Sequence, residues 1–240
     1  MKIGTLYGIS VGTGDPELIT VKGLKILQSS KVVAFPAGIN GLLGIAQQIV
    51  TPWINSNQQQ LALTFPYVQE RAVLKAAWKN AAVKVWQYLQ QGEDVAFVCE
   101  GDVSFYSTFS YLAQTLQQIH PEVLVQSIPG VCSPMAAASA LGLPLTVAAE
   151  KLVVLPAIYQ LNELEAVLDW AEVVVLMKVA SVYEQVWQIL NQRNLLERSR
   201  VVERATLPEM IIYNDLRDRP CLQLPYFSIL IVQVRDRRNY

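Results

Sequence analysis

The chain has 240 residues, of which 52% are hydrophobic, and its formal net charge is −1. This length and apolar content suffice for one large domain or two modest ones. Because the charges nearly balance, the composition excludes the strongly basic surface that proteins use to bind nucleic acid. Charged residues make up only 16% of the chain, so we expect part of the surface to be buried in an oligomer.

The first half of the sequence alternates strand and helix patterns in chain order. Apolar runs predict strands at 3–11, 31–35, 94–100 and 122–128, and helical patterns occupy 16–28, much of 67–91, and 104–118. The strands are continuous apolar runs and do not alternate, which is typical of a parallel sheet covered by helices on both faces.

The uncharged stretch 123–149 is long enough to span a bilayer. Three prolines and two glycines divide it into short pieces, so we expect a strand, a turn and a short helix, and no membrane span. The amino-terminal residues "MKIGTLYG" lack the apolar core of a signal peptide.

The second half follows a different pattern. It predicts a strand at 172–178 and a helix at 182–192, followed by three strand-like runs with no helix between them, at 200–206, 209–215 and 226–235. This order favours a mixed sheet with antiparallel pairs. We place the boundary where the pattern changes, which gives an N-terminal α/β domain at 1–147 and a C-terminal α/β domain at 148–240.

The first loop, "GTGDPE", has the layout of a phosphate-binding turn between a strand and a helix. The dinucleotide fingerprint fails at its third glycine position, which is Glu17, and no Gly-Lys-Ser/Thr follows. Asp15 is placed to be the helix N-cap and Pro16 to be its first residue. Their charge and geometry favour a stable helix start over capture of an anion, and a plain capped turn explains the spacing equally well.

Three further loops follow predicted parallel strands, at 36–44, 99–109 and 129–138. The carboxyl ends of parallel strands share one sheet edge, so these glycine-containing loops predict a ligand cleft there. No Ser/His/Asp set or metal-ligand spacing is present, and the three scattered cysteines favour a reducing cytoplasm over a disulfide framework or zinc site. Carboxylate pairs, Asp15 with Glu17 and Glu100 with Asp102, suit acid/base work or ribose binding. A reaction that needs no protein nucleophile and no metal fits these residues best. Transfer of a group from an already activated donor is such a reaction, in which the protein mainly orients two bound molecules.

Five segments, at 6–27, 99–112, 129–145, 174–190 and 201–206, resemble in order the motifs of the tetrapyrrole methylases. These S-adenosylmethionine-dependent enzymes act in vitamin B12 and sirohaem synthesis. The similarity is strongest to the branch that methylates precorrin-2, or cobalt-precorrin-2, at C20. It implies two α/β domains with a cleft between them, a cytoplasmic homodimer, and no protein-bound metal, nucleic acid or membrane partner.

The resemblance also implies roles for single residues. It assigns to the methyl donor Pro36, Gly101, Asp102, Phe105, Cys132, Ser133, Met177 and Ala205. Asp15 would face the tetrapyrrole, and Asp15 or Tyr106 would assist loss of a proton. Arg71 or Lys178 would bind substrate carboxylates, and Leu112 and Leu116 are candidates for the dimer interface.

The sequence departs from the common family pattern at four loop positions, Ser10, Thr13, Val103 and Cys132. A site that binds through the backbone tolerates such changes. Three alternatives stay open: methylation of another macrocycle position or acceptor, an NAD-binding oxidoreductase, and a non-catalytic dimeric binding module.

Overall fold

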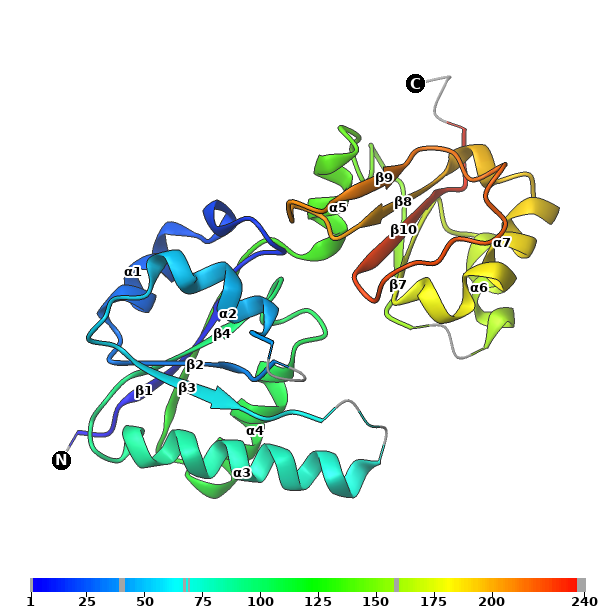
Figure 1. Ribbon diagram of the computed structural model, residues 1–240. Coiled ribbons are helices and arrows are strands. Elements are labelled where there is room, and N and C mark those ends of the chain that lie inside the picture. Colours follow the sequence, from blue (N-terminus) through cyan, green and yellow to red (C-terminus); the bar gives the residue numbers. More distant parts are fainter. Residues whose placement is uncertain (1, 39–41, 67, 69, 158–159, 237–240) are drawn as a thin grey trace. The chain divides into compact units, whose positions relative to one another are not determined.

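The computed structural model describes residues 2–38, 42–66, 68, 70–157 and 160–236. The chain divides into two compact units, Met1–Cys132 and Ser133–Tyr240, and each unit contains one five-stranded sheet (Figure 1). The division falls between residues 132 and 133, earlier in the sequence than the predicted boundary between residues 147 and 148. The reason is that α5 (Ser133–Ala140) packs against β10 (Ser228–Gln233) of the second sheet.

The first sheet is parallel throughout, as the apolar runs predicted. Its strands are β1 (Thr5–Ser10), β2 (Val32–Pro36), β3 (Gln59–Leu63), β4 (Val95–Cys99) and β5 (Leu124–Ile128), in the order β3-β2-β4-β1-β5. The sequence prediction missed β3, which is an edge strand with exposed glutamines at its start. An exposed edge strand lacks the apolar run that identified the others.

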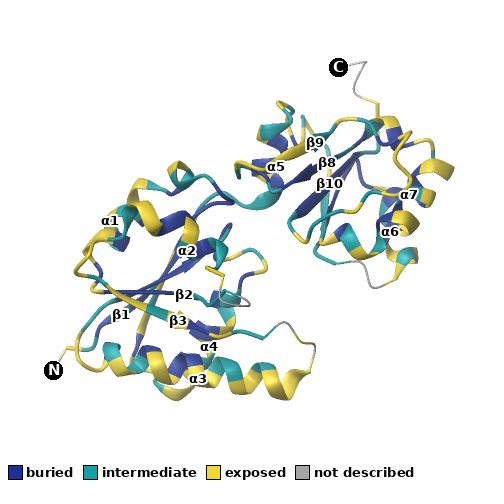
Figure 2. Cartoon of the chain, viewed as in Figure 1, coloured by how far each residue is buried: buried dark blue, intermediate teal, exposed yellow. Residues whose placement is uncertain are grey.

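Helices cover both faces of this sheet, which confirms the predicted fold class. They are α1 (Val21–Ser29), α2 (Ile45–Val50), α3 (Arg71–Leu89) and α4 (Thr108–Ile119). One apolar cluster joins α1 and α2 to Ile9, Val33 and Val98, and another joins α3 and α4 to Leu6 and Phe97. Figure 2 shows the resulting pattern of buried strands and helices that are exposed on their outer sides.

Two expectations for this unit were wrong in detail. Leu112 and Leu116 are fully buried, so they are not interface residues. They form the apolar stripe of α4, which faces the sheet as in other amphipathic helices. The helix predicted at 16–28 is divided into a short 3-10 helix, Pro16–Leu18, and α1, whose N-cap is Thr20.

The second sheet is mixed, as predicted. Its strands are β6 (Leu152–Leu155), β7 (Val173–Met177), β8 (Ser199–Glu203), β9 (Ile211–Tyr213) and β10, in the order β6-β7-β10-β8-β9. The β6–β7 pair is parallel, whereas β10 pairs antiparallel with both β7 and β8. Besides α5, the helices of this unit are α6 (Leu161–Leu168) and α7 (Tyr183–Gln192), with 3-10 helices at Val179–Val182 and Leu196–Arg198. A further 3-10 helix, Thr51–Trp53, follows α2 in the first unit.

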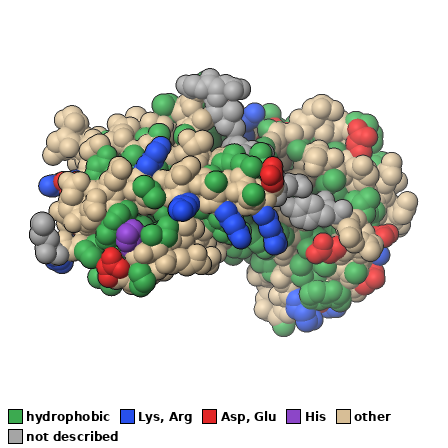
Figure 3. Space-filling view, turned by 90° about the horizontal axis from the view of Figure 1, so that it is seen from below, with side chains coloured by type: hydrophobic (Ala, Val, Ile, Leu, Met, Phe, Trp, Pro, Cys, Tyr) green, Lys and Arg blue, Asp and Glu red, His purple; other side chains and the backbone are tan. Residues whose placement is uncertain are grey.

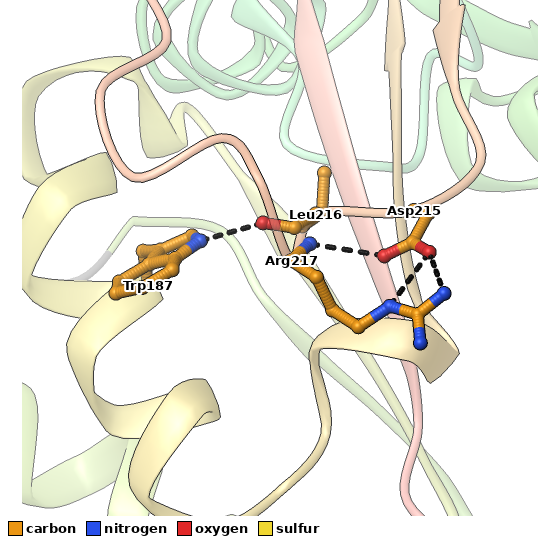
Figure 4. Close-up of polar contacts among 4 residues, drawn as sticks. All are labelled: Trp187, Asp215, Leu216 and Arg217. Atoms are coloured by element: carbon orange, nitrogen blue, oxygen red, sulfur yellow. Dashed lines mark hydrogen bonds and ion pairs between the residues drawn. The ribbon is translucent and has the colours of Figure 1, made fainter.

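Figure 4 shows two sets of polar contacts at the loop after β9, one that joins the loop to α7 and one within the loop. The indole N–H of Trp187 donates to the carbonyl oxygen of Leu216 over 2.7 Å. The Asp215 carboxylate accepts from the backbone N–H of Arg217 over 2.9 Å and from its Nε over 2.8 Å. Trp187 lies in the segment 174–190 that carries part of the resemblance, so this segment contributes to packing of the second unit.

The outer surface of the first unit carries a row of cations. Helix α3 has four exposed basic residues, Arg71, Lys75, Lys79 and Lys84, and no acidic residue along its length. Lysine and arginine side chains line up across the face shown in Figure 3. In the described part of the chain, no helix combines the length and apolarity needed to cross a membrane.

Candidate functional site

Four loops of the first unit follow the carboxyl ends of β1, β2, β4 and β5, which lie at one edge of the parallel sheet. β1 and β4 are neighbours in the sheet, but their connections run in opposite directions. The connection from β1 leads to β2, beyond β4, and the connection from β4 leads to β5, beyond β1. Ligands of open parallel sheets bind where neighbouring connections diverge in this way. The loops after β1 and β4 are therefore the centre of the candidate site.

Two glycines join these central loops. The backbone N–H of Gly101 donates to the carbonyl oxygen of Gly12 over 2.7 Å, and the reverse bond is 3.4 Å. Both have positive φ, 77° for Gly12 and 70° for Gly101, a conformation that side chains with a Cβ adopt rarely. Glycine at these positions is thus required by the backbone conformation of the loops.

The Asp102 carboxylate organises the loop after β4. One oxygen accepts from the backbone N–H of Ser104 over 2.8 Å and from its hydroxyl, and the other accepts from the N–H of Gly130 over 2.7 Å. Ser10 Oγ lies 3.4 Å from the second oxygen. An ionised carboxylate has about four acceptor positions, so these contacts leave little capacity for a ligand.

Ser10, at the end of β1, connects the same loops. Its hydroxyl donates to the carbonyl oxygen of Ile128 over 2.7 Å and accepts from the N–H of Val103 over 2.9 Å. Ser10 is fully buried. Its two bonds tie the loops after β1, β4 and β5 into one rigid edge.

Burial and hydrogen bonding act oppositely on the two carboxyls of this loop. Burial disfavours ionised Asp102, but the hydrogen bonds from Ser104, Gly130 and Ser10 outweigh it, and the pKa is lowered. Glu100 has no such donors among the described residues, and burial raises its pKa to about 7. Carboxyls with opposite shifts are typical of sites in which acid and base roles are separated.

Several loops at predicted site positions contain strained backbone. Positive φ occurs outside glycine at Tyr106 (54°), Lys178 (53°), Arg204 (47°) and Thr206 (69°). This conformation is uncommon, and for a β-branched residue such as Thr206 it is a real outlier. The same conformation occurs at Ala148 (47°) and Asn194 (55°), which are not predicted site residues, so it is not confined to these loops.

The second unit brings its two predicted donor residues to one sheet edge. Met177 ends β7, and Ala205 follows β8 by two residues. Both Met177 and Val202 pair with Ile229 of β10, so the carboxyl ends of β7 and β8 are level, with one strand between them. Two strand spacings place the carboxyl ends of β7 and β8 roughly 10 Å apart.

The remaining predicted residues lie on the loops expected. Pro36 ends β2 and is half-buried, Cys132 closes the loop after β5, and Ser133 begins α5 of the second unit. The Phe105 and Tyr106 rings contact edge to face at 4.7 Å between centroids, and Tyr106 is 56% exposed.

Asp15 is the predicted N-cap: its Oδ1 accepts from the N–H of Glu17 over 2.8 Å. Sequence reasoning gave no role to Ser10 or Gly130, which lie 92 and 28 residues from Asp102 along the chain. Glu100 was recognised only as one member of a carboxylate pair.

The two glycines of the central loops differ in their surroundings. A Cβ built on Gly101 would meet no heavy atom within 4 Å outside residues 100–102, although the residue is buried, whereas one on Gly12 would lie 2.8 Å from the Leu18 Cβ. The space at the Cβ position of Gly101 is what a donor lying against this loop would require. Among the described residues, no group of three His, Cys, Asp or Glu side chains is arranged as metal ligands would be.

Residues 5–218 match the family model described as Tetrapyrrole (Corrin/Porphyrin) Methylases. The chain belongs to this family. A cobalt-precorrin-2 C(20)-methyltransferase of Salmonella typhimurium is 32% identical over 233 residues, which cover 95% of this chain and 96% of the relative. A precorrin-2 C(20)-methyltransferase of Sinorhizobium sp. is 31% identical over 238 residues, covering 96% and 95%.

The fold is likewise that of solved methylases of the family. The structure of uroporphyrin-III C-methyltransferase from Thermus thermophilus, complexed with S-adenosylhomocysteine, superposes with a TM-score of 0.65. The identity is 18%, and the match covers 95% of this chain and 97% of the other. The comparison confirms the two-domain methylase fold predicted from the sequence.

Proposed function

We propose that this tetrapyrrole methylase transfers a methyl group from S-adenosylmethionine to C20 of precorrin-2 or cobalt-precorrin-2, a step of cobalamin biosynthesis. The observation that carries the proposal is the identity of about a third, over nearly the whole chain, to enzymes named for this reaction. A dehydrogenase is disfavoured by the incomplete dinucleotide fingerprint at Glu17.

The donor fits the carboxyl edge of the first unit. A Cβ on Gly101 would meet no atom beyond its chain neighbours, and Phe105 lies on the same loop. Pro36 ends the neighbouring strand β2, and Cys132 closes the loop after β5. The family resemblance adds Ser133, Met177 and Ala205, and Asp102 contributes by fixing the loop. When bound, S-adenosylmethionine supplies an electrophilic methyl carbon on a sulfonium, so the protein needs to supply orientation more than a nucleophile.

The acceptor is a polycarboxylate, and it needs cations as well as a group facing its reacting carbon. Arg71 begins α3, directly after the chain leaves the carboxyl edge at β3, and Lys178 follows Met177. We assign substrate carboxylates to these two residues. Asp15 and Tyr106 are assigned to the acceptor side, where the family resemblance places them.

We also propose a cytoplasmic homodimer, from the family resemblance and the low content of charged residues. Its interface lies elsewhere than the buried α4 residues. Sedimentation that gives the monomer mass of 26.8 kDa at micromolar concentration would refute the dimer.

The reaction is tested by incubating the protein with precorrin-2, with and without cobalt, and a donor labelled in its methyl group. We expect one label per macrocycle, at C20, located by NMR. A label at another carbon would establish a different methylase of the same family. No transfer, together with tight NAD binding or with no donor binding, would support the oxidoreductase or the binding module instead.

The acceptor role of Asp15 gives a separate prediction. Asp15→Asn should lower kcat severalfold while leaving the S-adenosylhomocysteine Kd and the melting temperature unchanged, because asparagine caps helices as well as aspartate does. Asp15→Ala serves as a control, since it also removes the cap and should cost about 1 kcal/mol of stability. Normal kinetics for Asp15→Asn would leave Asp15 with its capping role alone.

A further inference from the structure

We infer that Glu100 is the proton acceptor of the methylation, the group that takes the proton from C20 after the methyl group has been transferred. This inference rests on the proposed function. It assigns to a single side chain a step that the family resemblance left between Asp15 and Tyr106.

The position of Glu100 comes from the topology of the first sheet. It directly follows β4, the central strand, so it lies at the carboxyl edge with β1 on one side and β2 on the other. The next residue is Gly101, where a Cβ would meet no atom beyond its chain neighbours. A donor that lies against Gly101, as proposed above, would therefore be next to Glu100.

The other carboxylates of this edge are occupied or exposed. Asp102 accepts hydrogen bonds from the N–H and hydroxyl of Ser104 and from the N–H of Gly130, and Ser10 Oγ lies 3.4 Å from its second oxygen. Asp15 caps the first turn, and Glu17 is exposed to solvent. Among the described residues, only Glu100 combines partial burial at this edge with a carboxyl that has no hydrogen bond or ion pair.

The proton balance of the reaction requires an acceptor. As the bond between C20 and the methyl carbon forms, the methyl–sulfur bond breaks and its electron pair leaves with the sulfur. The C20–H bond then breaks, its proton passes to the Glu100 carboxylate, and its electron pair restores the double bond of the macrocycle. Protonated Glu100 afterwards returns the proton to water.

The acidity of Glu100 suits this role at neutral pH. Burial raises its pKa to about 7, and proton transfer is most efficient when the pKa of the base is near the working pH. The titratable groups nearest in the chain are the Cys99 thiol at the end of β4, whose pKa burial raises to about 11, and on the same loop Asp102, whose pKa is lowered, and Tyr106. The β1 loop contributes Asp15 and Glu17, the β5 loop Cys132, and β2 and α2 none.

The test compares Glu100→Gln with the parent protein and with Glu122→Gln, a control at the opposite edge of the sheet. For Glu100→Gln we expect kcat to fall at least a hundredfold, while the Kd for S-adenosylhomocysteine, measured by calorimetry, stays within twofold. The parent kcat should rise with pH through about 7, because the base must be ionised, and the variant should lack this limb. Deuterium at C20 should slow the variant more than the parent.

Unchanged donor affinity also shows that Glu100→Gln is folded. A variant kcat within tenfold of the parent, or a retained pH limb, would overturn the inference. Loss of donor affinity with normal saturated turnover would make Glu100 a donor ligand and likewise overturn it. Methylation of C20 by the parent protein tests the proposed function separately. If the parent protein and Glu100→Gln methylate C20 equally well, only the role of Glu100 is refuted.

Discussion

Replacement of Gly101 by alanine is expected to weaken S-adenosylhomocysteine binding at least tenfold, which corresponds to about 1.4 kcal/mol. A Cβ at this position would meet no heavy atom within 4 Å outside residues 100–102, and Gly101 lies on the loop assigned to the donor. A methyl group there would occupy the volume that the donor needs. Calorimetric titration of the variant with S-adenosylhomocysteine measures the effect, and Gly101→Val should extend it.

The positive φ of Gly101 complicates this substitution, because any side chain strains the loop as well. Gly142 provides a matched control: its φ is 64°, and a Cβ there also meets no atom within 4 Å. Alanine at either position costs about 1–2 kcal/mol for the left-handed conformation. Melting curves of the ligand-free variants should therefore shift alike, while only Gly101→Ala loses donor affinity. Equal donor affinity in both variants would place the donor elsewhere.

The strands could be predicted wherever their burial left a continuous apolar run. β1, β2, β4 and β5 are such runs, and each strand that was predicted in the first unit is present. β3 is polar because it lies at the sheet edge, so its residues carry no comparable pattern. The same limit applies to Leu112 and Leu116, since helical spacing shows that a face is apolar but not which neighbour covers it.

The candidate site was predicted at the level of loops and not at the level of contacts. Glycine and acidic residues after parallel strands indicated the sheet edge at which these loops gather in the structure. The partners of the Asp102 carboxylate, Ser10 and Gly130, come from loops distant in the sequence, and nothing local marks them. The pKa values of the two carboxyls differ because burial raises that of Glu100, whereas hydrogen bonds, first from Ser104 and then from Gly130 and Ser10, lower that of Asp102, so the difference required the three-dimensional structure.

Asp102→Asn is expected to destabilise the protein by about 2–4 kcal/mol at neutral pH, because buried donors that lose an acceptor each cost about 1–3 kcal/mol. An amide keeps one acceptor oxygen, but its NH2 group would face donors from Ser104 or from Gly130. The three loops joined through Asp102 and Ser10 would then loosen together. Urea unfolding of parent and variant measures the difference in the free energy of unfolding.

The pH dependence of this difference identifies its cause. The pKa of Asp102 is lowered in the folded protein, so its stabilisation is complete above the unfolded pKa and is lost as the pH falls through the folded pKa. Parent and variant should therefore converge in acid. Asp215→Asn is the control: the pKa of Asp215 is also lowered, through its hydrogen bonds from Arg217, but the pair is exposed and such pairs contribute little. A loss of stability for Asp102→Asn no larger than that for Asp215→Asn would show that the loops at the carboxyl edge hold together without the ionised carboxylate.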